Sequence, residues 1–356
     1  MELEFKLFQK EKKKNIESLD QELLNFCIKF NEDHHLYCSE KEEAYSFMKA
    51  LTSSVYGLHK FKTVNYNRYI ENNLLNWYFS STHSDEDNLN NGINLLYYLF
   101  LNIQVKNKGF NERRDLLLQE ALNFILSENK NLFELEQINE VDSKDLKFYT
   151  HNKINAVVDF SFFPISDFKE EFIFIRIVQV GEVCFKLINS KIKKIISDIN
   201  NDIYNKQYLK EIIFLTDVLH ISARILKTMS PDHFLEFRAL TLNASAIQSY
   251  IYQEMDILML GMNPLKIPFY EKIPELKKLC EIYDTTTVNL KSLVKNDKIL
   301  DESFCSMLGE FNKKMLKWKA IHIGLAMSYI PKKAEGTGTK EGIDYLSKVL
   351  KDSIFE

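Results

Sequence analysis

The chain has 356 residues, of which 45% are hydrophobic and 13% aromatic, so it is long enough to bury a substantial core. Its 46 basic and 50 acidic side chains give a net charge of -4, which excludes a broad basic surface of the kind that binds nucleic acid. The five cysteines are scattered and form no C-x-x-C pair, which argues against a disulfide framework or a thiolate zinc site. A reducing cytoplasm is the expected environment.

The sequence predicts a protein that does not enter a membrane. The first residues, MELEFKLFQKEKKKN, carry charge without a following apolar stretch, so no secretory signal is expected. The longest unbroken apolar run, Leu95 to Leu101, is far too short to span a bilayer and is typical of a buried helix.

The first 160 residues contain no proline and carry apolar residues at intervals of three and four. This spacing predicts amphipathic helices over residues 19–30, 45–51 and 95–103, with a polar loop over residues 80–91. Between residues 144 and 167 the pattern becomes irregular, which predicts a domain boundary. We therefore expect an N-terminal helical domain of unknown role over residues 1–150 and a second domain over residues 151–356.

Helical spacing returns in the second domain. The predicted helices cover residues 172–200, 207–227, a segment from Pro231 that Ser230 can cap, a segment from about Ala244, 275–283 and 304–329, with a proline-bearing loop over 262–274. No segment alternates convincingly as a strand does. The predicted fold class is all-α.

On the helix predicted over residues 304–329, His322 lies in an apolar stripe. Such a histidine can be a core residue that one hydrogen bond satisfies. Alternatively, its neutral imidazole can ligate a flat apolar cofactor, because haem needs a hydrophobic wall and an axial nitrogen. The periodicity of the helix does not choose between these two interpretations.

Three blocks of sequence resemble a known family. KWKAIH followed by GTGTKEGIDYL is similar to the tryptophan dioxygenase pattern, in which a Trp precedes the haem-ligating His by four residues and a GTGG-type loop follows. FIRIVQVGEVCFK resembles the family's FIxxHQxxELWFK helix, and MSPDHFLEFRALTLNASAIQS resembles its MTPxxFxEFR...ASGFQS block. Residues 170 to 350 are thus identified as similar to the tryptophan and indoleamine 2,3-dioxygenase superfamily.

This resemblance implies an all-helical bundle that holds one haem b and inserts both atoms of dioxygen across the indole C2–C3 bond. The implied partners are a small aromatic amino acid, such as L-tryptophan, and dioxygen. Neither nucleic acid nor a membrane is expected as a partner. A homodimer or homotetramer is also implied.

The resemblance assigns roles residue by residue. His322 matches the iron ligand, and Trp318, Gly336 and Gly338 match the motifs that accompany the cofactor. Arg238 matches the arginine that clamps the substrate carboxylate, since a guanidinium can donate two parallel hydrogen bonds to it. Its alternative is an ordinary surface ion pair.

Thr337 matches the threonine of a loop that closes over the amino-acid end of the substrate; its alternative is a plain mobile linker. Phe174 and Phe234 match aromatic positions of the substrate pocket, although core packing is an alternative for either.

The main departure from the family is at Val178, where the family has a distal His. No catalytic base is therefore assigned. A buried indole N–H without a partner would weaken tryptophan binding by roughly 1 to 3 kcal/mol. A haem-dependent monooxygenase or rearranging enzyme of a specialised biosynthetic pathway is one alternative function. A non-catalytic haem-binding helical protein is another.

Overall fold

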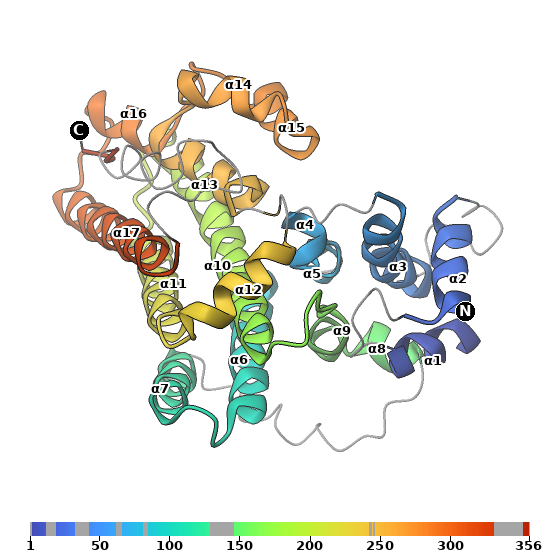
Figure 1. Cartoon of the computed structure of the whole chain (residues 1–356). Helices are drawn as coiled ribbons and strands as arrows, with labels where there is room; N and C mark the ends of the chain where they lie inside the picture. Colours follow the sequence, from blue (N-terminus) through green and yellow to red (C-terminus); the bar gives the residue numbers. More distant parts are fainter. Residues whose placement is uncertain are drawn as a thin grey trace. The chain divides into compact units, whose positions relative to one another are not determined.

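The computed structural model describes residues 2–11, 19–32, 43–61, 66–80, 85–128, 146–241, 244, 246–330 and 352–355. Every regular element in these segments is an α-helix or a short 3-10 helix (Figure 1). Since no strand occurs in the described part of the chain, the predicted all-α fold class is confirmed there.

The chain forms two compact units. The first contains residues 1–179 and 228–244, and the second contains residues 180–227 and 245–356. The long helix α10 (Lys169–Ile199) contributes residues to both units. The division into domains over residues 1–150 and 151–356 stays a prediction.

The first unit is built from short and medium helices. They are α1 (Glu2–Glu11), α2 (Gln21–Glu32), α3 (Glu43–Phe61), α4 (Tyr66–Tyr69), α5 (Asn72–Ser80), α6 (Asp85–Asn107), α7 (Glu112–Glu128), α8 (Leu146–His151), α9 (Lys153–Phe160), the start of α10, and α12 (Pro231–Leu240). The predicted amphipathic faces are buried, since Leu23, Phe30, Met48, Leu51, Leu95 and Leu99 have no exposed surface. The rings of Phe5, Phe47 and Phe160 lie 5.4 to 6.1 Å apart and fill the core between these helices.

Two predicted irregular stretches of the first unit are partly helical. The prediction of a loop over residues 80–91 is wrong from Asp85 onward, where α6 begins. The irregular region predicted over residues 144–167 contains α8 and α9 and is irregular only after Phe160. In both places the packing of apolar side chains outweighs weak local helix propensity.

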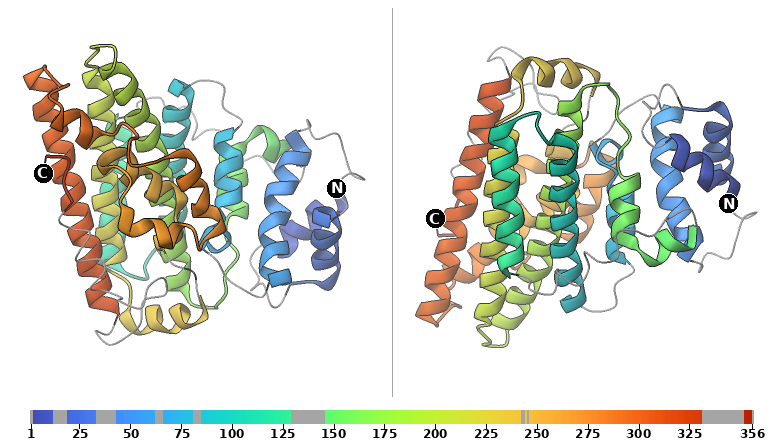
Figure 2. Two further views of the ribbon diagram at one scale, coloured as in Figure 1. Left: turned by 90° about the horizontal axis from the view of Figure 1, so that it is seen from above. Right: turned by 90° about the horizontal axis from the view of Figure 1, so that it is seen from below.

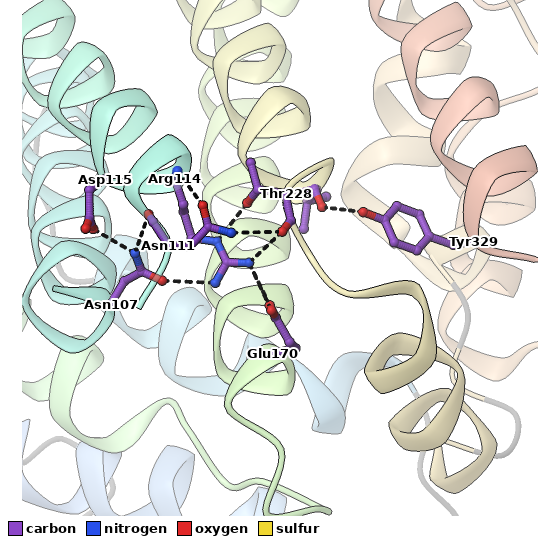
Figure 3. A network of polar contacts seen from close by, with 8 residues as sticks. Asn107, Asn111, Arg114, Asp115, Glu170, Thr228 and Tyr329 are labelled. Atoms are coloured by element: carbon purple, nitrogen blue, oxygen red, sulfur yellow. Dashed lines mark hydrogen bonds and ion pairs between the residues drawn. The ribbon is translucent and has the colours of Figure 1, made fainter. Parts of the chain in front are cut away.

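Arg114 of α7 is a fully buried charge that joins three segments of the first unit (Figure 3). Its Nη2 donates to both carboxylate oxygens of Glu170 at 3.0 and 2.9 Å. Its Nη1 donates to Asn107 Oδ1 at 3.0 Å, and its Nε donates to Thr228 Oγ1 at 2.7 Å. The guanidinium thereby ties the end of α6 and the start of α10 to the segment that precedes α12.

Arg176 of α10 is a second buried arginine, with 1% of its surface exposed, and it is held by neutral acceptors. It donates to Asn102 Oδ1 at 3.1 Å, Val158 O at 2.6 Å, Ser161 Oγ at 2.7 Å and Gln179 Oε1 at 2.8 Å. Burial lowers the pKa of Arg176 to about 10, so the guanidinium remains charged at neutral pH. These bonds orient the α10 turn that carries Phe174 and Val178.

The second unit contains the longest helices. It is built from the remainder of α10, α11 (Lys206–Leu226), α13 (Tyr250–Leu260), α14 (Ile267–Tyr270), α15 (Pro274–Ile282), α16 (Leu290–Lys295) and α17 (Glu302–Tyr329), with 3-10 turns at Ala246–Gln248 and Pro264–Lys266. Side-chain caps define several starts: Asn205 accepts from the amide of Gln207, and Asp301 accepts from the amide of Phe304.

Helices α11 and α17 lie side by side in the second unit (Figure 1 and Figure 2). Lys314 Nζ donates to both oxygens of Asp217 at 2.6 and 2.8 Å, and the Lys314 carbonyl oxygen lies 2.9 Å from His220 Nε2. Near the end of α17, the Tyr329 hydroxyl donates to the carbonyl oxygen of Leu226 at 3.1 Å. These contacts set the register of α17 against α11.

Most helix limits predicted after residue 170 agree closely with the structure, but there are several differences. The sequence pattern did not predict α16, and the loop predicted over residues 262–274 contains the short helix α14. α10 begins at Lys169, three residues early, because Glu170 and Glu171 suit a first turn. The helix expected from about Ala244 begins at Tyr250, after Ser249 caps it through the Tyr252 amide. Ser230 occupies the N-cap position of α12, but its side chain makes no capping hydrogen bond.

We expect Arg114→Met to lower the free energy of unfolding by about 3–5 kcal/mol, because it leaves the Glu170 carboxylate buried without its counter-charge. Urea denaturation followed by circular dichroism measures the change. Arg113→Met is the matched control, since Arg113 is exposed. Equal effects of the two substitutions would contradict the stabilising role of the Arg114 network.

Candidate functional site

A partly open aromatic surface lies on one face of α10 in the first unit. Between residues 172 and 179 the side chains of α10 are buried except Phe174 and Val178, which are partly exposed and lie one helical turn apart. The centroid of the Phe174 ring lies 5.8 Å from that of Phe234 and 5.4 Å from that of Phe237, both on α12. We call Phe174, Val178, Phe234 and Phe237 the ring cluster. Its open apolar face suits a flat aromatic ligand.

The segment at residues 66–70 packs behind the ring cluster. Tyr66, Tyr69, Ile70 and Ile175 form a buried group against which Phe174 and Val178 pack. The ring centroids of Tyr69 and Phe174 are 6.4 Å apart. A part of the chain before residue 150 thus contributes to the same cluster as the predicted pocket residues, which the sequence pattern did not indicate.

Arg238 follows Phe234 by one turn on α12, so the two side chains leave the helix on the same face. It is half-buried, and burial lowers the pKa of its guanidinium from the ordinary value of 12.5. A charged guanidinium beside aromatic rings can bind the carboxylate end of an aromatic amino acid.

His322 and Trp318 form the centre of an aromatic group in the second unit. Their rings are stacked on α17, with centroids 5.5 Å apart and an interplanar angle of 24°. Phe185 of α10 lies 5.3 Å from Trp318, and Tyr252 of α13 lies 5.8 Å from it. Three helices of this unit thus build an apolar wall around the indole ring that supports His322.

The imidazole of His322 is half-buried and makes no hydrogen bond within the described part of the chain. Burial lowers its pKa below the ordinary value of 6.5, which favours the neutral form at neutral pH. A core histidine normally satisfies its ring nitrogens, as His220 does with the Lys314 carbonyl oxygen. A neutral imidazole that makes no hydrogen bond to the described residues and lies beside an apolar wall fits the axial ligand of a haem.

A buried charge cluster holds α17 next to α13. Asp256 Oδ1 accepts from Lys319 Nζ at 3.0 Å, and Oδ2 accepts from Lys266 Nζ at 2.7 Å. All three residues are at most 6% exposed. Although burial alone would raise the pKa of Asp256, the charges and hydrogen bonds of the two lysines lower it far below its ordinary value. Lys319 follows Trp318 directly, so this cluster positions the turn that carries His322.

Several other residues in the motif blocks have structural contacts. Gln179 Nε2 donates to the carbonyl oxygens of Ile70 at 2.9 Å and Ser161 at 2.7 Å. In the second unit, Ser249 Oγ donates to Glu182 Oε1 at 2.6 Å while it caps α13. These motif positions hold helices and loops in place, which accounts for polar residues on buried faces.

The structure therefore brings Phe174, Val178 and Phe234 together in the first unit, with Arg238 one turn beyond, and brings His322 and Trp318 together in the second. Thr337, Gly336 and Gly338 lie outside the described residues. The sequence pattern did not point to Tyr69, Tyr252 or Asp256. In the sequence, the single sign of a buried Asp256 is that it is a lone acidic residue within the apolar run MDILML.

These features define an all-helical protein with an apolar aromatic site and a neutral helix-borne imidazole. Residues 163–296 match the model of the tryptophan 2,3-dioxygenase family. The tryptophan 2,3-dioxygenase of Bacillus thuringiensis (strain Al Hakam) is 25% identical over 235 residues, which cover 54% of this chain and 83% of that protein. The second half of the chain is thus similar to the tryptophan 2,3-dioxygenase family.

Two further relatives show the range of the similarity. The tryptophan 2,3-dioxygenase of Geobacillus thermodenitrificans (strain NG80-2) is 21% identical over 272 residues, covering 65% of this chain and 96% of that protein. The tryptophan 2,3-dioxygenase of Bacillus anthracis is 32% identical over 114 residues, which cover 32% of this chain and 41% of that protein. The family match ends before His322, so the role of this residue depends on its motif and its surroundings.

No helix among the described residues is both long enough and apolar enough to cross a membrane. They also contain no group of three or more His, Cys, Asp or Glu side chains arranged to hold a metal ion.

We expect Asp256→Asn to lower the free energy of unfolding at pH 7 by about 3–5 kcal/mol, because it leaves two buried lysines without a carboxylate. The exposed residue Glu281 provides the control, Glu281→Gln, which should change stability by less than about 0.5 kcal/mol. Urea unfolding curves measure both values.

This loss should depend on pH in a defined direction. The pKa of Asp256 is lower in the folded than in the unfolded protein, so its contribution is complete above the unfolded pKa of about 3.9. The contribution is lost as the pH falls from there towards the folded pKa. The difference between wild type and Asp256→Asn should therefore be constant from about pH 7 to 5 and shrink below about pH 4. A difference that shrinks near neutral pH would contradict the assignment.

Proposed function

We propose that this protein is a haem-dependent oxygenase that acts on L-tryptophan or a related indole or aromatic amino acid. The observation that carries the proposal is His322, a half-buried imidazole with a lowered pKa and no hydrogen bond in the described chain, stacked on Trp318. The similarity of residues 163–296 to the tryptophan 2,3-dioxygenase family supports it.

In this proposal His322 offers a ring nitrogen to the iron of haem b, and Trp318, Phe185 and Tyr252 provide apolar surface for the macrocycle. Haem, when bound, supplies the activation of dioxygen for insertion across the indole C2–C3 bond. Gly336 and Gly338 are proposed to contact the cofactor. The protein contributes position and the exclusion of water.

The substrate is proposed to lie with its ring against Phe174, Val178 and Phe234 and with its carboxylate on Arg238. The apolar side chains exclude water from the ring, and the guanidinium fork fixes the amino-acid end. Thr337 is proposed to contact the same end when its glycine-rich loop closes. Because Val178 has no titratable group, we assign no proton acceptor at this position.

A second candidate function is that of a haem-dependent monooxygenase or rearranging enzyme. It is favoured by the apolar side chain of Val178, which stands where the family has a histidine. The mass of the product formed from L-tryptophan separates the two functions. A gain of two oxygen atoms supports dioxygenation, and a gain of one supports the second candidate.

We expect purified protein reconstituted with haem to show a Soret band that His322→Ala abolishes, because the substitution removes the proposed axial ligand. Added imidazole should restore part of the band by filling the vacated volume. His151→Ala, at an exposed histidine, is the control and should leave the spectrum unchanged. A Soret band that is identical in wild type and His322→Ala would contradict the proposal.

We expect Arg238→Gln to weaken binding of L-tryptophan about 10- to 100-fold, because a hydrogen-bonded charge pair with the carboxylate is lost. Spectral titration of the haem-loaded protein measures the affinity. Tryptamine, which lacks the carboxylate, should bind both forms equally. Arg224→Gln changes an exposed arginine and should leave tryptophan affinity unchanged. Equal losses for tryptophan and tryptamine would indicate a structural role for Arg238 instead.

A further inference from the structure

A polar groove lies between α3 and α5 of the first unit, two helices that pack against each other (Figure 1). The residues that line it recur every three or four positions along each helix, so one face of each helix forms a wall. The groove has a volume of about 460 Å³, within the range of about 300–1,000 Å³ that is typical of small-molecule sites. It lies in the part of the chain that the family match does not cover and contains no residue of the ring cluster.

Most side chains that line the groove are polar, and none of them is acidic. The polar ones are Ser46, Lys49, Ser53, Asn73, Asn76 and Ser80. Lys49 is exposed, and its Nζ lies 5.9 Å from the centre of the Tyr45 ring, which also lines the groove. The Lys49 ammonium forms no ion pair with a described residue, whereas the neighbouring Lys153 is paired with Glu43 at 2.9 Å. The groove therefore suits an anionic group and disfavours a cationic one.

The serines of the groove offer hydrogen-bond acceptors. Ser46 and Ser53 of α3 and Ser80 of α5 each donate the hydroxyl hydrogen to a backbone carbonyl oxygen three or four residues earlier, at 2.8, 2.5 and 2.9 Å. Because these protons are used within the helices, the lone pairs of the serine oxygens can only accept. A ligand that lies against them must supply donors, as a hydroxylated molecule does.

The remaining walls add groups that suit a molecule with several hydroxyls. Asn73 and Asn76 carry amides, which both donate and accept hydrogen bonds. Trp77 donates its indole N–H to Ser46 Oγ at 3.1 Å, which fixes the indole in the wall of the groove. Serine acceptors, amides and one ammonium together require a ligand that has hydroxyl groups and a single anionic end.

We propose that the groove between α3 and α5 binds a small hydroxylated molecule that carries one anionic group, a sugar acid or a sugar phosphate. Its hydroxyls donate to the oxygens of Ser53 and Ser80 and exchange hydrogen bonds with the asparagine amides, and its anionic group pairs with Lys49. The proposal is independent of the haem function. It gives the N-terminal helices a binding role of their own.

Isothermal titration of the whole chain with matched small molecules tests the ligand class. Gluconate and glucose 6-phosphate have both features, glucose lacks the charge, and acetate and inorganic phosphate lack the row of hydroxyls. At least one of the first two should bind about tenfold more tightly than each of the other three, and their order distinguishes a carboxylate from a phosphate. Equal affinity for all five compounds, or no binding of either of the first two, would overturn the proposal.

Substitutions in the groove test the site. Lys49→Gln should weaken binding of the preferred anion about tenfold and leave glucose unaffected, because a charge-assisted hydrogen bond is lost. Ala50→Tyr should abolish binding of both, since Ala50 lines the groove and a larger side chain fills it. Lys108→Gln is the control, because Lys108 is exposed and lies outside the groove. If Lys49→Gln and Lys108→Gln weaken binding equally, the charge effect is not local and the proposal is wrong.

The two tryptophans of the chain, Trp77 and Trp318, provide a readout that locates the ligand. In protein labelled with ¹⁵N at tryptophan, binding should shift the indole N–H signal of Trp77, which lies in the groove wall, and leave that of Trp318 unchanged. Trp318→Phe identifies the Trp77 signal. A shift of Trp318 alone would place the ligand outside the groove and contradict the proposal. The Soret band, recorded in the same titration, should not change, so failure of the haem function and failure of this inference are distinguishable.

Discussion

The pairing of buried charges is the constraint on which both units of this helical protein depend. Arg114 is matched by Glu170, and Asp256 is matched by Lys266 and Lys319. Arg176 is fully buried and is held by four neutral acceptors. Removing one partner of a buried ion pair strongly destabilises a protein. The pairs of Arg114 and of Asp256 therefore fix which helices meet and in which register. The apolar faces alone would allow several registers.

Against this paired background, the imidazole of His322 is half-buried and makes no hydrogen bond to the described residues. It is stacked on the ring of Trp318, with Phe185 and Tyr252 packed around the indole. A ring nitrogen in apolar surroundings is what the proposed haem-dependent function requires of this helix.

Val178, which stands where the family has a histidine, packs against residues from the N-terminal part of the chain. A valine in place of the family's histidine removes a polar group from the ring pocket. Residues 66–70, which belong to the part of the chain that the family match does not cover, pack against the same helix face. The N-terminal helices thus contribute side chains to the surroundings of the proposed ring pocket.

The sequence by itself determined the helical fold class, the limits of most helices after residue 170 to within a few residues, and the similarity to the tryptophan 2,3-dioxygenase family. Apolar spacing, caps and motif blocks are local patterns, so they can be recognised without knowledge of the tertiary fold. Sequence patterns also singled out Phe174, Phe234 and the pair Trp318 and His322, because these residues lie in the motifs themselves.

The tertiary structure alone decided which polar groups are paired. Lys319 and Asp256 are 63 residues apart, and Arg114 and Glu170 are 56 residues apart, so no local pattern joins them. The same holds for the position of Tyr69 behind Phe174, and for the finding that no described residue makes a hydrogen bond to His322. Whether a buried polar atom has a partner depends on every segment packed around it, and only the folded chain brings those segments together.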